Sequence, residues 1–220
     1  MTAQSMRWWW RWFRYVTAGE LLGFLVPAVV GASIRDARPF LAALLLVVAG
    51  IGEGAILGSI QAWVLREAVS GMPARQWVVA TMAGAGLAWS VGAVLVASEG
   101  LQGWPVPAVV LTVAVGAPVM LGSLGVAQWW VLRSLIAGTG SWVWVTAAAW
   151  MLGLTAFALV STPLWQPGQS TAAVVSIAVL AGLVMSSVMA GITGAWLVHL
   201  LNGRHCTAGG GGRRSVERGA

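Results

Sequence analysis

Six long apolar stretches run through the chain, and each is bounded by charged residues or by the Gly and Pro residues of turns. Each stretch is close to the roughly 20 residues that a helix needs to cross a bilayer. The sequence therefore predicts an all-α integral membrane protein with six transmembrane helices. With ends accurate to about three residues, the predicted spans lie at about 15–34, 40–65, 76–97, 107–132, 142–161 and 172–201.

A nine-residue motif recurs near the end of each even-numbered stretch. It reads GSIQAWVLR at 58–66, GVAQWWVLR at 125–133 and, in a more divergent copy, GITGAWLVH at 191–199. The copies begin 67 and 66 residues apart. An interval this regular indicates a triplicated unit rather than chance similarity between apolar helices.

The odd-numbered stretches repeat as well, because each opens with an aromatic residue four positions before a threonine. These pairs are Phe13 with Thr17, Trp77 with Thr81, and Trp142 with Thr146. We therefore predict three tandem two-helix repeats of about 65 residues, at about 13–66, 77–133 and 142–199. Each repeat crosses the membrane twice, so the copies run parallel, and we expect a pseudo-threefold arrangement about the membrane normal.

Arginine accounts for all 12 basic residues and sets the expected orientation. Ten arginines fall on the side of the N-terminus, and only Arg35 and Arg38 fall on the other side. The positive-inside rule then places both termini in the cytoplasm. The absence of Lys and the richness in Ala, Gly and Val indicate a bacterial gene, so the expected location is the cell (cytoplasmic) membrane.

The composition excludes a water-soluble fold, because 59% of the residues are hydrophobic and only 8% are charged. The net charge of +6 comes from arginines in short segments that flank apolar spans. Membrane topology explains these charges better than nucleic-acid binding does. The expected partners are the lipid bilayer and, beyond it, other membrane proteins or a second copy of the chain.

Two terminal segments flank the predicted transmembrane domain, residues 15–202. Residues 1–14 alternate Arg and Trp, which is typical of a cytoplasmic arm at the headgroup region. A cleavable signal peptide is the alternative, and Glu20 and the place of Thr17 in the repeat argue against it. Residues 203–220 predict a flexible Gly/Arg cytoplasmic tail.

The repeated motif separates into two helix faces at 100° per residue. Glycine and glutamine share one face, and tryptophan and arginine lie on the other. The second set is typical of interfacial anchors, namely Trp63, Arg66, Trp130, Arg133, Trp196 and His199. The glycines are expected at close contacts between helices, namely Gly54, Gly58, Gly125 and Gly191. Gln61 and Gln128 would either make interhelical hydrogen bonds or line a polar site.

Tryptophan occurs 15 times, and most of these residues lie near the ends of the predicted spans. Trp77 and Trp142 belong to this group, which is typical of the aromatic belts at membrane interfaces. Trp89 and Trp150 lie deeper in their spans. There we expect them to fill space beside glycines, with a pocket for an aromatic ligand as the alternative.

Two carboxyl groups fall inside the predicted spans, and charge in hydrocarbon is costly. Glu53 lies in the middle of the second span, and Glu20 lies in the first at a depth similar to that of Gln61 and Gln128. One hypothesis makes Glu53 a mid-membrane proton or cation site, reached from the cytoplasm through the glutamine layer. In the other, a protonated Glu53 donates a hydrogen bond between helices.

Catalysis is not expected, because the chain has one Cys and two His and none of the common catalytic or nucleotide-binding motifs. No metal and no cofactor are expected either. The sharpest functional hypothesis is a small-solute or ion permease, or the substrate-binding component of one. The alternative is a non-catalytic integral subunit or scaffold that packs against other membrane proteins. A cavity that reaches Glu53 would favour the first hypothesis, and a tightly packed bundle would favour the second.

Overall fold

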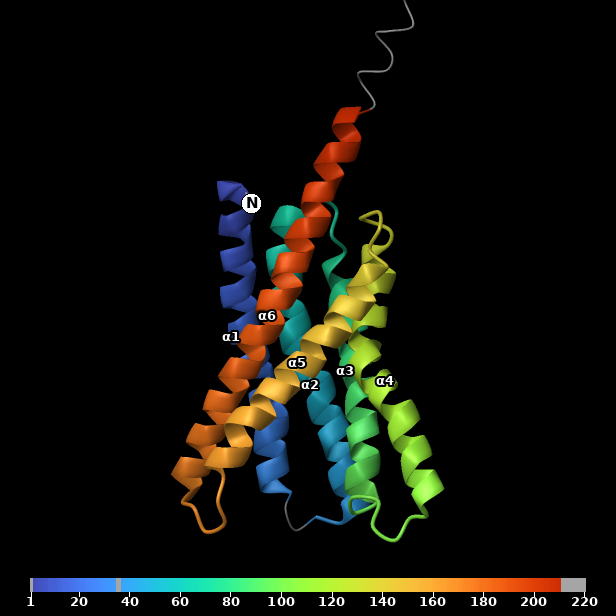
Figure 1. Ribbon diagram of the computed structural model, residues 1–220, viewed down its shortest axis with the longest axis vertical. Helices are drawn as coiled ribbons and strands as arrows, with labels where there is room; N and C mark the ends of the chain where they lie inside the picture. The colour runs from blue at the N-terminus through green and yellow to red at the C-terminus, as the bar shows by residue number, and fades with distance from the viewer. Residues whose placement is uncertain (1, 35–36, 211–220) are drawn as a thin grey trace, which may run out of the picture.

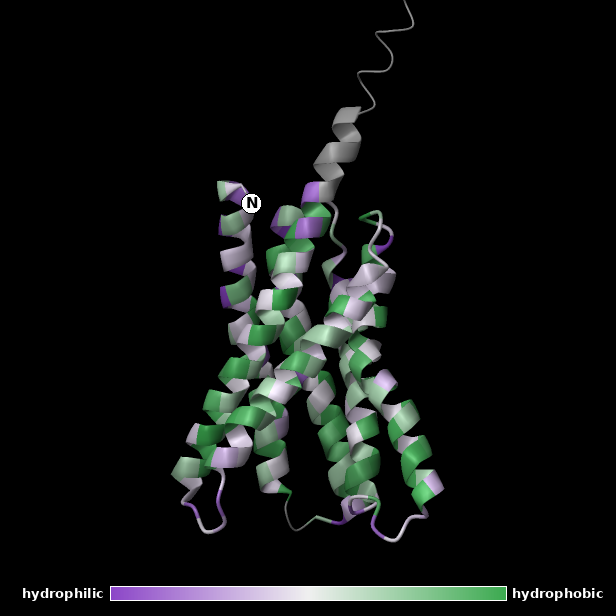
Figure 2. Cartoon of the chain, in the orientation of Figure 1, coloured by the Kyte–Doolittle hydropathy of each residue, from purple (hydrophilic) through white to green (hydrophobic). Residues whose placement is uncertain are grey.

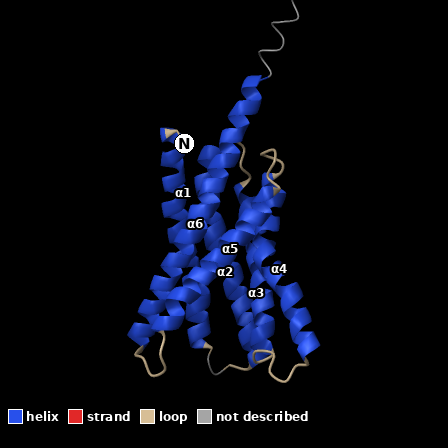
Figure 3. Cartoon of the chain, viewed as in Figure 1, coloured by secondary structure: helices blue, strands red, loops and turns tan. Residues whose placement is uncertain are grey.

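Six long helices make up the described part of the chain. The computed structural model describes residues 2–34 and 37–210, with side chains up to residue 202. The helices are α1 (Ala3–Ser33), α2 (Pro39–Ala68), α3 (Ala74–Ala97), α4 (Val106–Leu132), α5 (Ser141–Leu164) and α6 (Thr171–Gly210). Short loops connect them (Figure 3). All six are long and apolar enough to cross a membrane, so the prediction of six such helices is confirmed.

The helices form a closed ring. Each helix packs against its neighbours in the chain, and α6 returns to pack against α1 (Figure 1). The end of the bundle that carries the N-terminus also holds the loops at 69–73 and 133–140, and we term it the N-terminal end. The loops at 98–105 and 165–170 lie at the opposite end, toward which the helices spread apart.

Apolar residues predominate along all six helices (Figure 2), and many large apolar side chains are exposed. Large ones such as Phe40, Val106 and Leu159 are mostly exposed, as expected where lipid rather than water surrounds the helices. The chain is therefore a multi-pass membrane protein in contact with a bilayer. Glycines with positive φ lie in the connecting loops, among them Gly71 at 76° and Gly168 at 82°, where other residues would be strained.

Helix α1 begins at Ala3, so residues 3–14 belong to it rather than to a separate arm. The segment holds no Gly or Pro, and Thr2 caps it by accepting a hydrogen bond from the backbone N–H of Ser5 at 3.2 Å. Of the predicted tail, α6 extends the backbone to Gly210. The rest of the tail, 211–220, lies outside the described residues.

The core of the bundle lies toward the N-terminal end. Three tryptophans, Trp12, Trp77 and Trp142, are completely buried there. Leu65, Leu132 and Leu197, which come from the three even-numbered helices, belong to the same buried cluster. The helices are therefore tightly packed toward the N-terminal end of the bundle. The larger space between them lies nearer the opposite end.

Candidate functional site

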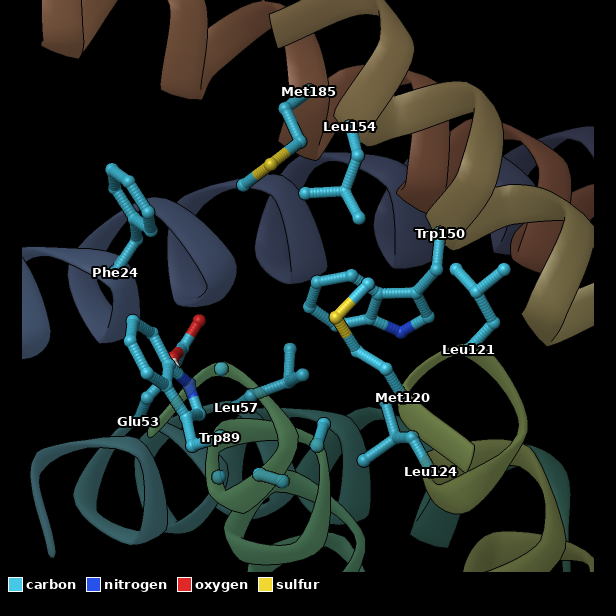
Figure 4. Close-up of a pocket in the computed structure, with 14 residues that line it drawn as sticks. Phe24, Glu53, Leu57, Trp89, Met120, Leu121, Leu124, Trp150, Leu154 and Met185 are labelled. Atoms are coloured by element: carbon cyan, nitrogen blue, oxygen red, sulfur yellow. Dashed lines mark hydrogen bonds between the residues drawn. The ribbon is translucent and has the colours of Figure 1, made fainter. Parts of the chain in front are cut away.

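A cavity of about 240 Å³ lies inside the ring of helices, and we term it the central cavity. All six helices contribute to its lining, from Phe24 on α1 to Met185 on α6 (Figure 4). Most lining side chains are apolar, and three are aromatic: Phe24, Trp89 and Trp150. Glu53 is the charged residue among those that line the cavity.

Three helices meet around the side chain of Glu53. Glu53 on α2 is 4% exposed, and Trp89 Nε1 on α3 donates a hydrogen bond to its Oε2 at 2.7 Å. Gly50, three residues earlier on α2, leaves room for the Trp89 ring, because a Cβ there would overlap the indole. Gly23 on α1 faces the other side, where a Cβ would stand 3.2 Å from Glu53 Cγ. Glu53 therefore accepts an interhelical hydrogen bond, whereas one of the two hypotheses from the sequence had it donate one.

A buried hydrogen-bond network lies between the central cavity and the N-terminal end. Trp77 Nε1 on α3 donates to Gln61 Oε1 on α2 at 3.1 Å. Trp142 Nε1 on α5 donates to Gln128 Oε1 on α4, also at 3.1 Å. Gln128 Nε2 then donates to Gln61 Oε1 at 2.9 Å and to Thr81 Oγ1 at 3.2 Å. We term these five residues the tryptophan–glutamine network, and it joins α2, α3, α4 and α5.

The burial of Trp77 and Trp142 corrects the assignment of these residues to an interfacial belt. Trp12 makes a third bond of this kind, since its Nε1 donates to Thr193 Oγ1 on α6 at 3.2 Å. The physical reason is that each indole ring fills the core while its N–H reaches a polar partner on the neighbouring helix. The three tryptophans are spaced 65 and 65 residues apart, so Trp12, and not Phe13, matches the other two.

A smaller cavity of about 20 Å³ lies among the same polar side chains, and we term it the inner cavity. Glu20, Gln61 and Gln128 line it together with Thr146 and Ser186. The structure thus brings three of the four candidate residues to one place and leaves Glu53 in the larger cavity. The glutamines are hydrogen-bonded to each other and to tryptophans, so this layer is packed and forms no open route to Glu53.

The other face of the motif lies on the outside of the bundle. Trp63 and Trp130 are 45% and 62% exposed, and Arg66 is exposed as well. The guanidinium carbon of Arg133 lies 3.3 Å from the centre of the Trp130 ring, in a cation–π contact. In the third copy, Trp196 is half-buried, its ring lies 4.8 Å from that of His199, and its Nε1 donates to Ser141 Oγ.

The motif glycines lie at different kinds of contact. A Cβ on Gly54 would stand 2.9 Å from the carbonyl oxygen of Thr81, and one on Gly58 would stand 2.9 Å from Thr81 Cβ. A Cβ on Gly125 would lie 3.0 Å from the carbonyl oxygen of Val143. Gly191 has more room, because the nearest atom would be 3.9 Å away. Gly194, three residues later, lies closer to another helix, because a Cβ there would stand 2.6 Å from Trp12 Cδ1.

The closest approach of a helix glycine to the backbone of a neighbouring helix is made by Gly84, which lies outside the motif. A Cβ on Gly84 of α3 would stand 2.7 Å from Leu124 Cα on α4. Ser123 Oγ also donates to the carbonyl oxygen of Gly84 at 2.9 Å. Sequence reasoning missed this contact, although Gly84 lies three residues after Thr81 and on nearly the same helix face.

No protein-family model, no curated protein and no solved structure matches this chain. Among the described residues, no three His, Cys, Asp or Glu side chains lie close enough together to hold a metal ion. The two cavities and the groups that line them are therefore the features from which a function can be inferred.

Proposed function

We propose that this membrane protein binds a small organic cation in the central cavity, as a permease or as the substrate-binding component of one, with no catalytic step. One observation carries the proposal: a single carboxyl group, Glu53, lies in a cavity that aromatic and apolar side chains from all six helices otherwise line. A carboxylate in such surroundings is costly unless a positive charge pairs with it. A ligand that brings its own charge supplies that partner.

The lining favours an organic ammonium group over an inorganic ion. The faces of Trp89 and Trp150 attract cations, and aromatic cages of this type are a common way to bind quaternary ammonium groups. A metal cation such as Ca²⁺ takes about six to eight oxygen ligands, and the apolar lining offers few. The cavity is also smaller than the roughly 300 Å³ at which ligand pockets typically begin, so the ligand has to be compact.

The position of the cavity supports a transport role. It lies about midway along α2, and membrane transporters commonly bind their substrates near the middle of the bilayer. The tryptophan–glutamine network fills the bundle on the N-terminal side of the cavity. Such a closed layer suits a protein that exposes its ligand to one side of the membrane at a time.

Replacing Glu53 with glutamine is the direct test. Calorimetry on the protein in lipid nanodiscs would measure binding of benzyltrimethylammonium, with its uncharged carbon analogue as a second ligand. We expect Glu53→Gln to weaken binding of the cation at least tenfold, or about 1.4 kcal/mol, and to leave binding of the neutral analogue nearly unchanged.

Glu67→Gln is the matched control, because Glu67 lies on the same helix but is exposed and paired with Arg11. This variant should bind the cation like the wild type. Equal binding by Glu53→Gln and the wild type would contradict the proposal. If the wild-type protein shows no saturable binding, the scaffold hypothesis stands in its place.

We also propose that the six helices are three copies of one hairpin around a pseudo-threefold axis. The buried tryptophans support this reading, because each donates its indole N–H from an odd-numbered helix to the preceding even-numbered helix in the ring. The acceptors are Thr193 for Trp12, Gln61 for Trp77 and Gln128 for Trp142. The same bond would then recur at each junction between copies.

We propose that the protein lies in the cell membrane with the N-terminal end of the bundle facing the cytoplasm. This orientation is supported by the arginines at that end of the described chain, among them Arg7, Arg11, Arg14, Arg66, Arg75 and Arg133. In a variant whose native Cys206 is replaced by serine, a cysteine placed at Gln102, in an exposed loop at the opposite end, should react with a membrane-impermeant maleimide in intact cells. A cysteine at Ser70 should react only after the cells are opened, and the reverse pattern would invert the topology.

A further inference from the structure

The inner cavity has room for one water molecule. Its volume of about 20 Å³ exceeds the roughly 10 to 15 Å³ that a water requires. A buried water also needs two to four polar partners. Glu20, Gln61 and Thr146 provide such groups around this space.

The carboxyl group of Glu20 has no partner among the described residues. Glu20 is 1% exposed, and neither of its oxygens makes a hydrogen bond within the described part of the chain. The same is true of Thr146 Oγ1, which is also buried. Polar groups buried without partners cost free energy. A water in the inner cavity, and a proton on the carboxyl group, would satisfy them.

The surrounding oxygens are already in use, which disfavours a metal ion at this place. Gln61 Oε1 accepts hydrogen bonds from both Trp77 and Gln128. Gln128 Oε1 accepts from Trp142, and Thr193 Oγ1 accepts from the indole of Trp12. The oxygens of Glu20 and Thr146 make no hydrogen bond among the described residues, and Ser186 Oγ only donates, to the carbonyl oxygen of Gly182. These oxygens are too few for a metal that prefers about six oxygen ligands. They are enough for a proton and one water.

A thin apolar wall separates the two cavities. Leu57, Leu124 and Trp150 line both of them, so these three side chains form the wall. Glu20 lies on α1 one turn before Gly23, the residue that packs against Glu53, a rise of about 4.5 Å. The residues that α2, α4, α5 and α6 contribute to the inner cavity carry no charge.

We infer that Glu20 and one enclosed water form a second ligand site, which binds a proton. Glu20 is 1% exposed and its oxygens have no partner among the described residues, so a negative charge there would be costly. With a proton on Glu20, the carboxyl group can donate a hydrogen bond to the water and leaves no charge in this part of the bundle.

Infrared difference spectroscopy tests the proton site without any ligand. On titration of the protein in nanodiscs, the wild type should show the carbonyl band of a buried protonated carboxyl group, which Glu20→Gln removes. Thr146→Val should shift this band by removing the hydroxyl group that faces it, and Glu67→Gln should leave it unchanged. A band that survives unchanged in Glu20→Gln, or is unmoved in Thr146→Val if the first variant does not fold, overturns the inference.

Discussion

Replacing Trp77 with alanine is expected to lower the free energy of unfolding by about 4 kcal/mol, as is typical when a buried aromatic side chain is truncated. Trp77 is completely buried in the core, and its ring lies 6.5 Å from that of Trp142. The truncation also removes the indole N–H that Gln61 Oε1 accepts. Equilibrium unfolding in mixed detergent micelles, followed by tryptophan fluorescence, measures the loss.

Two further variants separate the causes of this loss. Trp77→Phe keeps an aromatic ring and removes only the N–H and some volume, so we expect it to cost about 1 kcal/mol. Trp144 on α5 is 78% exposed, and Trp144→Ala should cost less than about 0.5 kcal/mol. Equal stability of Trp77→Ala and Trp144→Ala would show that Trp77 is an interfacial residue after all.

Replacing Gly84 with alanine is expected to destabilise the protein by about 3 kcal/mol, because the added methyl group would overpack a close helix contact. The methyl carbon would stand 2.7 Å from Leu124 Cα and 3.1 Å from the carbonyl oxygen of Ser123. Both are backbone atoms, so no side chain can rotate away to make room. The same unfolding measurement reports the effect, and the hydrogen bond from Ser123 Oγ to Gly84 should weaken with it.

Gly122 on α4 is the matched control for Gly84, since a Cβ there would meet no atom within 4 Å. Gly122→Ala should change the stability by less than about 0.5 kcal/mol. Gly84→Ala should also weaken cation binding, because Ala85 and Leu124 beside the contact line the central cavity. Similar stabilities of the two variants would mean that α3 and α4 lie farther apart than the structure places them.

The sequence alone was enough to predict the six helices, because a span of apolar residues in lipid has to satisfy its backbone hydrogen bonds internally. Each predicted span lies within one helix, except that the first extends one residue beyond the end of α1. Helix geometry also separated the two faces of the motif, and in the structure Gln61 is buried whereas Trp63 is exposed. Glu53 could be identified from the sequence as a candidate binding residue, because charge inside a membrane span is costly and therefore rare.

Periodicity could not predict which tryptophans are buried. A tryptophan near the end of a span suits both a membrane interface and a buried position with a polar partner, because its ring is apolar and its N–H is polar. The choice for Trp77 depends on Gln61 lying opposite it on α2, and that depends on how the two helices are aligned. The start of α1 at Ala3 was missed for a related reason, since Trp12 is buried only where it meets Gly194 on α6.

What the sequence determined by itself was the set of membrane helices, the inward and outward faces of the motif, and the few polar residues placed inside the bilayer. These follow from each helix separately, through its length, its period and the cost of burying charge. Only the tertiary structure decided that Glu53 faces a central cavity, that Trp89 holds it, and that Glu20 lies behind an apolar wall. Such features depend on side chains from different helices meeting in space, and the period of one helix carries no information about its neighbours.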